Sequence, residues 1–379
     1  MKHLFFGLVT IFFFSSFAGI SQTNNKDRIE IEKALQNYIE GSSYNQPERI
    51  EKAFFPMANL YLDHKEKDLW IVPISEYTSW FKKGTPGEYN GRIGKIISID
   101  CYNNIAWAKV EILFPTKGLE FMDMFLLKKI EGKWKIISKS AGSKKSNRSG
   151  DRILFIVSNA HYHGNSDIPT GNSFSEIVNA YNTFKESGYT VDFVSPDGGS
   201  IPLAYINTSD SLHKKYLYDP DFMYAIKHTR KPEEIKPEDY KAVHYIGGGS
   251  AMYGVPENSH IQKLSMTIFE EYNGIISSVC HGTAGIVNLK TKDGKYLVDG
   301  KVISGYPDSY EKHDADYLKQ FPFHIQKTIE DRGGTFKFSP RNSPHVEAQE
   351  NLITGQNYLS SKDVALKIIE KLKMEKKTE

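Results

Sequence analysis

The 379-residue chain has only two cysteines, Cys101 and Cys280, which excludes a disulfide framework and a cysteine-rich zinc module. Cys101 lies in a strand-like run and Cys280 in a turn, so we expect both thiols to be free. The chain also has little net charge, because 48 Lys and Arg side chains stand against 46 Asp and Glu side chains. A net charge of +2 supplies no basic field, so we expect no nucleic-acid partner.

Long apolar runs are also scarce, and the one that occurs, from Leu4 to Phe14, is shorter than the roughly 20 residues that span a bilayer. Lys2 and His3 precede this run and small residues up to Ser21 follow it, as in a secretory signal peptide. We therefore expect a signal peptide over residues 1–21 that is removed on export. The mature protein is then expected to be periplasmic or secreted, with no membrane contact.

Residues 29–141 begin with a helical pattern and continue as a series of strands. Apolar residues recur at helical spacing, and Gly41 is expected to stop the helix. Strands are expected at 92–102, 105–114, 121–130 and 134–138. This order indicates an α+β, cone-like domain. Residues 142–150 are rich in Ser, Gly and basic side chains and are interpreted as a linker.

Residues 151–372 follow a different pattern, in which continuous apolar strands alternate with amphipathic helices near 173–187 and 259–272. This alternation predicts an α/β domain whose mainly parallel sheet is sandwiched by helices. In such sheets ligands bind at the carboxyl ends of the strands.

Cys280 stands at such a strand end. A buried strand from Ile275 leads into Cys280-His281-Gly282 and then into an expected helix, which is the pattern of a nucleophile elbow. The N–H groups that begin a helix favour a thiolate, so we expect a lowered pKa for Cys280. The alternative is a small buried side chain without chemistry, which is the usual state of a lone cysteine.

Three consecutive glycines, Gly247 to Gly249, follow another buried strand. The N–H groups of Gly248 and Gly249, with the amide of His281, are candidates for binding an oxyanion. His161 and His163 have the spacing of metal ligands but lack a convincing third ligand. We expect neither a metal nor another cofactor.

Several stretches of residues 151–372 resemble the ThiJ/PfpI superfamily, which has the flavodoxin-like, class I glutamine amidotransferase-like fold. A histidine directly after the cysteine is similar to the heat-shock chaperone and glyoxalase III branch, whose members typically convert methylglyoxal to lactate without glutathione or metal. One departure is that this branch often has a histidine where Gly249 or Ser250 stands. The stretches that carry the resemblance are Thr170-Gly171 with Glu176, VDFVSPDGG, AVHYIGGGSAMYGVPEN, VCHGTAG and NLITGQN.

The resemblance implies a role for four residues. Cys280 corresponds to the nucleophile, His281 to its partner imidazole and Glu176 to the carboxylate that contacts the thiol. Glu311 corresponds to the acid that orients the histidine, with Asp308 as a substitute. A thiolate that adds to an aldehyde forms a hemithioacetal, and the following proton transfer needs a nearby base.

Residues 29–141 resemble a nuclear transport factor 2-like or lumazine-binding-like cone. Such cones hold small ligands, and Asp123, flanked by Phe121 and Phe125 on its strand face, is the candidate pocket carboxylate. The alternative is a structural or dimerising domain with no chemistry. Because both kinds of domain often dimerise, a homodimer is expected.

The sequence thus predicts an exported cysteine-dependent enzyme that converts methylglyoxal or a related reactive aldehyde to a 2-hydroxy acid. Two other classes remain open. One is a holdase chaperone or redox-sensing binding protein, and the other is an amidase or peptidase-type hydrolase. Turnover of methylglyoxal separates the first class from the other two.

Overall fold

The computed structural model describes residues 17–376, with side chains from residue 26 onward, and divides into two compact units between Ser146 and Asn147. The expected signal peptide, residues 1–21, lies outside the described residues except for the backbone of its last five positions. Within residues 17–376, no helix combines the length and the apolar character that crossing a membrane requires.

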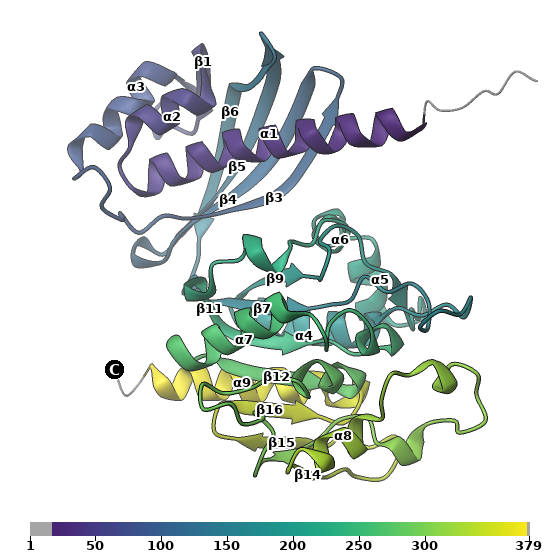
Figure 1. Ribbon diagram of the computed structural model, residues 1–379. Coiled ribbons are helices and arrows are strands. Elements are labelled where there is room, and N and C mark those ends of the chain that lie inside the picture. The colour runs from purple at the N-terminus through teal and green to yellow at the C-terminus, as the bar shows by residue number, and fades with distance from the viewer. Residues whose placement is uncertain (1–16, 377–379) are drawn as a thin grey trace, which may run out of the picture. The chain divides into compact units, whose positions relative to one another are not determined.

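The first unit packs a long helix, α1 (Phe17–Ser43), against a curved six-stranded sheet (Figure 1). Two short helices, α2 (Pro47–Ala53) and α3 (Ile74–Ser79), complete it. The strands pair antiparallel except β1 with β6, which confirms the predicted α+β class. They are β1 (Phe54–Leu62), β2 (Trp70–Pro73), β3 (Ile93–Tyr102), β4 (Ile105–Phe114), β5 (Leu119–Ile130) and β6 (Lys133–Lys145), in the order β2-β1-β6-β5-β4-β3.

Helix α1 buries the apolar stripe that its sequence predicts, and Leu35 and Tyr38 are fully buried. Gly41, however, does not stop the helix, which continues to Ser43. A Cβ at Gly41 would lie 2.8 Å from Cγ1 of Ile50 in α2. The glycine is needed because the second helix packs closely against the first, which local sequence pattern does not show.

The boundary between the units differs from the expected linker, residues 142–150. Strand β6 runs on to Lys145 and pairs with β5 along that length, with Met122 opposite Gly142 and Leu119 opposite Lys145. The pairing with β5 satisfies the backbone hydrogen-bonding groups of residues 142–145, which the composition alone predicted to belong to an unstructured linker. The connection to the next strand is therefore shorter and begins at Ser146.

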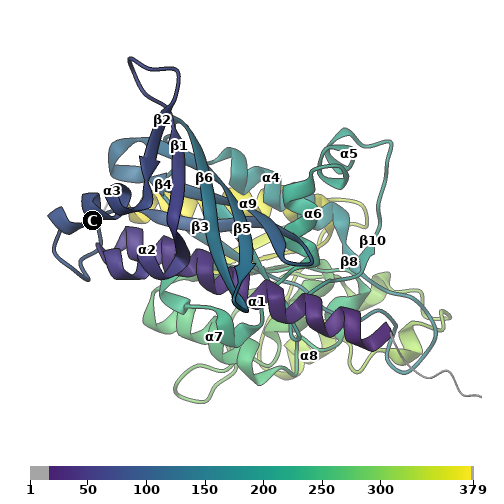
Figure 2. The same cartoon turned by 90° about the horizontal axis from the view of Figure 1, so that it is seen from above.

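The second unit contains a six-stranded sheet in the order β15-β16-β12-β11-β7-β9, parallel except for β15 with β16. Helices α4 and α9 lie on one side of it and α7 and α8 on the other (Figure 2). This is the predicted mainly parallel sandwich. The elements are β7 (Arg152–Ile156), α4 (Phe174–Glu186), β9 (Thr190–Val194), β11 (Tyr240–Tyr245), α7 (Ser259–Glu271), β12 (Ile275–Val279), α8 (Ile325–Asp331), β15 (Val346–Gln349), β16 (Leu352–Gly355) and α9 (Ser361–Glu375).

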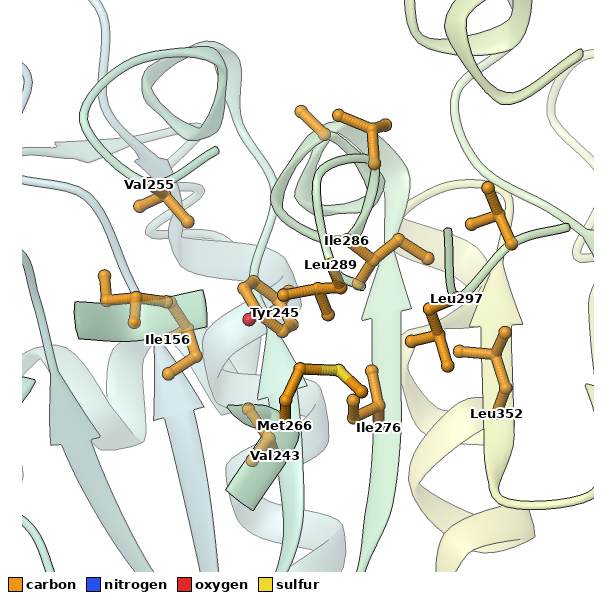
Figure 3. Packing of buried hydrophobic residues seen from close by; sticks show 14 of the residues in the cluster. Ile156, Val243, Tyr245, Val255, Met266, Ile276, Ile286, Leu289, Leu297 and Leu352 are labelled. Carbon is orange, nitrogen blue, oxygen red and sulfur yellow. The ribbon is translucent and has the colours of Figure 1, made fainter. Parts of the chain in front are cut away.

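Successive residues of the central strands enter opposite cores. In β12, Ile276 faces the core that contains Tyr245 and Met266, whereas Ile275 faces the core beneath α4 and α9. Figure 3 shows Ile276 and Tyr245 together with Ile286, which follows the end of β12. Burial on both faces explains the continuous apolar runs, and it fixes the end of β12 as a rigid platform.

Candidate active site

Cys280 occupies a sharp turn at the carboxyl end of β12. Its φ angle of +56° lies in the left-handed region, which is unusual for a residue with a side chain, and 8% of its surface is exposed. The predicted elbow is therefore present. The expected helix is the segment Cys280–Ile286, which is a 3-10 helix.

Two glycines allow this turn to lie directly on β11. A Cβ at Gly282 would be 2.3 Å from the carbonyl oxygen of Tyr245, and one at Gly285 would be 2.3 Å from the Tyr245 ring. Any side chain at either position would push the turn away from the sheet. The absence of side chains at Gly282 and Gly285 therefore determines how close Cys280 lies to the sheet.

His281 connects the thiol to a carboxylate. Its Nδ1 lies 3.5 Å from Sγ of Cys280, and its Nε2 lies 2.7 Å from Oε1 of Glu311. The ring stacks on Tyr306 at a centroid distance of 4.6 Å. An imidazole that donates from Nε2 to Glu311 has its Nδ1 lone pair free to accept the thiol proton, as in a catalytic triad.

Glu311 is itself held by a second partner, because Oε2 accepts a hydrogen bond of 3.0 Å from the Tyr317 hydroxyl. Burial acts to raise the pKa of Glu311, but the bonds from His281 and Tyr317 outweigh it, and the pKa is lowered. Asp308 was the substitute considered from the sequence. It instead accepts hydrogen bonds from the backbone N–H groups of Gln326 and Lys327 at the start of α8. The orienting acid is therefore Glu311.

Glu176 is buried beside the thiol, with 1% of its surface exposed. It stands in the first turn of α4, where the Ser173 side chain caps its backbone N–H, and its Oε2 accepts a 2.8 Å bond from the Gly247 N–H. Burial raises the pKa of Glu176 to about 7, although the bonds from Gly247 and Cys280 act in the opposite direction. A carboxyl group with this pKa is suited to accept and return a proton at neutral pH.

The expectation that the pKa of Cys280 is lowered is wrong. Burial and the neighbouring Glu176 carboxylate raise the pKa of the Cys280 thiol, and these effects exceed that of the His281 N–H, which favours the thiolate. Because the two groups contact each other, a charge on Glu176 disfavours a charge on Cys280. A thiolate therefore forms most readily when Glu176 carries the proton.

The three glycines bring backbone close to this pair. Gly247 directs its N–H at Glu176, a role that the sequence did not indicate. Gly248 has φ of +94°, and a Cβ there would be 2.3 Å from the Gly171 carbonyl oxygen. At Gly249 a Cβ would be 2.5 Å from Oγ1 of Thr170. Gly248 and Gly249 thus permit the segment after β11 to pack closely against residues 170 and 171.

Sequence reasoning missed most of the aromatic side chains around the site. Tyr306 stacks on His281, and Phe321 approaches the same ring edge-on at 5.7 Å. Tyr205 is an exposed residue with a φ of +59°, and its phenol lies within electrostatic range of Cys280 and Glu176. These residues come from loops far apart in the chain, and no local pattern marks them.

Of the two candidate metal-ligand histidines, His161 is exposed and His163 is buried. Across residues 17–376, no group of three or more His, Cys, Asp or Glu side chains is arranged to hold a metal ion.

Asp123, the candidate carboxylate of the first unit, is 1% exposed and has strong partners. Its Oδ2 accepts a 2.5 Å bond from the Tyr38 hydroxyl and lies 2.9 Å from Nζ of Lys139. The carboxylate is therefore neutralised by the protein itself and is not open to a ligand as the sequence suggested.

Residues 169–371, more than half of the chain, match the DJ-1/PfpI family. The chain belongs to this family. Residues 26–140 match the family described as "Putative lumazine-binding". Both matches confirm the resemblances found in the sequence, and they place Cys280 and Glu176 within the DJ-1/PfpI part.

Several relatives within the family are glyoxalases. The glutathione-independent glyoxalase hsp3102 of Schizosaccharomyces pombe is 28% identical over 213 residues, covering 52% of this chain and 86% of the relative. The glutathione-independent glyoxalase HSP31 of Saccharomyces cerevisiae is 27% identical over 217 residues, covering 54% and 90%. The crystal structure of glyoxalase III from Candida albicans has the same fold, with a TM-score of 0.53, 23% identity and coverage of 58% and 97%. The chain is thus a distant homologue of glutathione-independent glyoxalases.

Proposed function

We propose that this chain is an exported, cysteine-dependent enzyme that converts methylglyoxal or a related 1,2-dicarbonyl to a 2-hydroxy acid without glutathione. One observation carries the proposal: the Cys280 thiol lies between an oriented imidazole, His281, and a buried carboxyl group, Glu176, whose pKa is about 7. The first supplies a base for the thiol, and the second supplies a group that exchanges protons at neutral pH.

In the first step His281 accepts the proton of Cys280, and Sγ attacks the aldehyde carbon, C1. The carbon–sulfur bond forms as the carbonyl π electrons move to oxygen, which takes up a proton to give a hemithioacetal. The N–H groups of Gly248, Gly249 and His281 are the donors proposed for the oxyanion of this step.

In the second step we assign to the Glu176 carboxylate the removal of the proton from C1 and its return to C2. The proton of the C1 hydroxyl moves to the C2 oxygen, which completes the C2 alcohol. C1 rises to the oxidation level of a thioester while the C2 ketone is reduced to an alcohol, so the redox change is internal. Water then cleaves the thioester, which releases the 2-hydroxy acid and regenerates the thiol. Atoms and electrons balance with water as the only co-reactant.

The proposal is tested by incubating the purified protein with methylglyoxal and measuring both dicarbonyl loss and lactate formation. The wild-type protein should form lactate without added glutathione, and Cys280→Ser should not, because the weaker oxygen nucleophile lacks a strong enough base. Lactate formation that survives in Cys280→Ser contradicts the assignment. Absence of turnover combined with suppression of client aggregation, or with amide hydrolysis, would favour the chaperone or hydrolase class instead.

Export is proposed from the apolar run and small residues of positions 1–21. Intact-mass measurement of protein from the cell envelope should show the loss of about the first 21 residues. Recovery of the full-length chain in the cytosol would contradict this part of the proposal without affecting the chemistry.

A further inference from the structure

The site contains a second imidazole that the mechanism above does not use. His163 lies in the loop after β7, where it is 7% exposed, and its backbone N–H binds the Ile168 carbonyl. Its ring lies 5.8 Å from that of Phe321, which also contacts His281. It lies 5.3 Å from the ring of Tyr317, whose hydroxyl binds Glu311. His163 therefore packs against the same side chains that hold the triad.

The ring of His163 fills the space in front of Gly249. A Cβ at Gly249 would lie 2.6 Å from Cε1 of His163 and 3.2 Å from its Nε2. The absence of a side chain at Gly249 therefore makes room for the His163 ring.

The neighbours of His163 determine which nitrogen carries its proton. The Tyr253 hydroxyl donates its single hydrogen to the Gln320 carbonyl at 3.2 Å. Its 3.4 Å contact with Nδ1 of His163 is therefore made with Nδ1–H as the donor. Burial lowers the pKa of His163, and the nearby His281 adds to that effect, so the ring is neutral. Its Nε2 consequently has a free lone pair, and no partner for it occurs among residues 17–376.

The segment from Gly247 to Gly249 runs from the neighbourhood of Glu176 to that of His163. A Cβ at Gly247 would lie 2.7 Å from Oε2 of Glu176 and 2.9 Å from the His281 nitrogen, whereas Gly249 lies against His163. Gly247 and Gly249 are two residues apart in the chain, so their Cα atoms lie at most about 7 Å apart. A three-carbon adduct on Cys280, extended by one hydrogen bond, can bridge a distance of this order.

We propose that His163 is a substrate-binding residue whose Nε2 accepts a hydrogen bond from the C2 hydroxyl that appears as the Cys280 adduct rearranges. The inference rests on the proposed function and names the group of the substrate that the site recognises. The starting dicarbonyl has no hydrogen on its C2 oxygen, so this bond forms only after proton transfer begins. Such an interaction raises kcat without tightening substrate binding.

The test compares His163→Phe with His161→Phe, a matched change in the same loop at an exposed position. Phenylalanine keeps a ring against Tyr317 and Phe321 but has no lone pair. His163→Phe should lower kcat for methylglyoxal about 10-fold with little change in KM. Iodoacetamide labelling of Cys280 should stay at the wild-type rate, and His161→Phe should match the wild type. Wild-type kcat in His163→Phe, or equally slowed labelling, would overturn the proposal.

The tautomer is measured separately, from the imidazole ¹⁵N resonances of the full chain. They should show a protonated Nδ1 and an unprotonated Nε2 in His163 at pH 7, and the reverse tautomer would overturn the inference. Failure of the proposed function would differ, since the wild-type protein itself would then form no lactate.

Discussion

Each unit of the chain buries one carboxylate almost completely, and the two have opposite surroundings. Asp123 in the first unit lies 2.9 Å from the Lys139 ammonium, which is 4% exposed. Glu176 in the second unit has a backbone N–H and a thiol as neighbours, with no cation of that kind. The charge of Asp123 is balanced by an ion pair, whereas burial raises the pKa of Glu176 to about 7, so this group is present in both protonation states near neutral pH.

This difference in surroundings predicts different roles for the two carboxylates. Breaking a buried ion pair leaves an isolated charge, so the Asp123–Lys139 pair stabilises the fold only while both partners are present. A carboxyl group whose pKa lies near 7 changes protonation easily at neutral pH and is suited to proton transfer. We therefore expect substitutions of Asp123 to alter stability, and substitutions of Glu176 to alter turnover.

The largest expected effect is that of Asp123→Asn. It leaves Lys139 buried without its carboxylate, which should lower the free energy of unfolding of the first unit by about 3–5 kcal/mol. All four tryptophans, at positions 70, 80, 107 and 134, lie in this unit, so tryptophan fluorescence in urea follows its unfolding within the intact chain.

The matched control is the double variant Asp123→Asn with Lys139→Met, which removes both charges. It should recover most of the lost stability, and neither variant should change methylglyoxal turnover per folded molecule. A loss below about 1 kcal/mol in the single variant would show that the ion pair is no more important than an exposed one.

Glu176→Gln should have the next largest effect. Glutamine retains an oxygen for the Gly247 N–H but cannot exchange a proton, so turnover should fall by about 10²–10⁴-fold. The thermal stability of the second unit should not fall, because a neutral amide replaces a group that burial already disfavours in its charged form. Activity within tenfold of the wild type would remove Glu176 from the proton transfer.

The pH dependence of stability gives a smaller effect with a definite sign. Between pH 4.5, the ordinary pKa of the group, and about 7, its folded value, the native state binds more protons through Glu176 than the unfolded state does. The free energy of unfolding should therefore fall as the pH rises through this window, by a few kcal/mol at most. Urea unfolding of the second unit, followed by circular dichroism, should show this slope in the wild type and a flatter one in Glu176→Gln. Equal slopes would contradict a raised pKa.

Tyr317→Phe should produce the smallest change. It removes one of the bonds that lower the pKa of Glu311, so that pKa should rise toward its ordinary value. Turnover at neutral pH should fall only a few-fold, as expected for the loss of about 1 kcal/mol from one hydrogen bond. The acidic limb of the kcat/KM profile should move to higher pH, and an unmoved limb would show that Tyr317 acts through packing alone.

The fold and the elbow could be predicted because their signals are local. Strands buried on both faces need continuous apolar runs, and the turn at Cys280 lies at the end of one of them. The Asp123–Lys139 pair could not be predicted, because it depends on the register that sets Lys139 opposite Phe125 across β5 and β6. Lys139 lies one residue beyond the strand expected at 134–138, whereas β6 continues to Lys145 and its pairing with β5 buries the lysine.

Other parts of the site depend on long-range contacts. The contact of His163 with Phe321 joins positions more than 150 residues apart. The pKa of Cys280 is raised first by the burial of the thiol and then by the neighbouring Glu176 carboxylate, and neither is visible in the sequence. The sequence indicated which groups lie together around Cys280 but not their protonation.

The contact of Gly282 and Gly285 with Tyr245 affects how the site can change during evolution. Mutations beneath the thiol would move the nucleophile itself and damage every reaction equally, so this part of the site has little freedom to vary. The side chains that surround the opening, such as Tyr205 and His163, come from loops and can change one at a time. A descendant of this chain could therefore acquire new substrates through these loops while its nucleophile stayed in place.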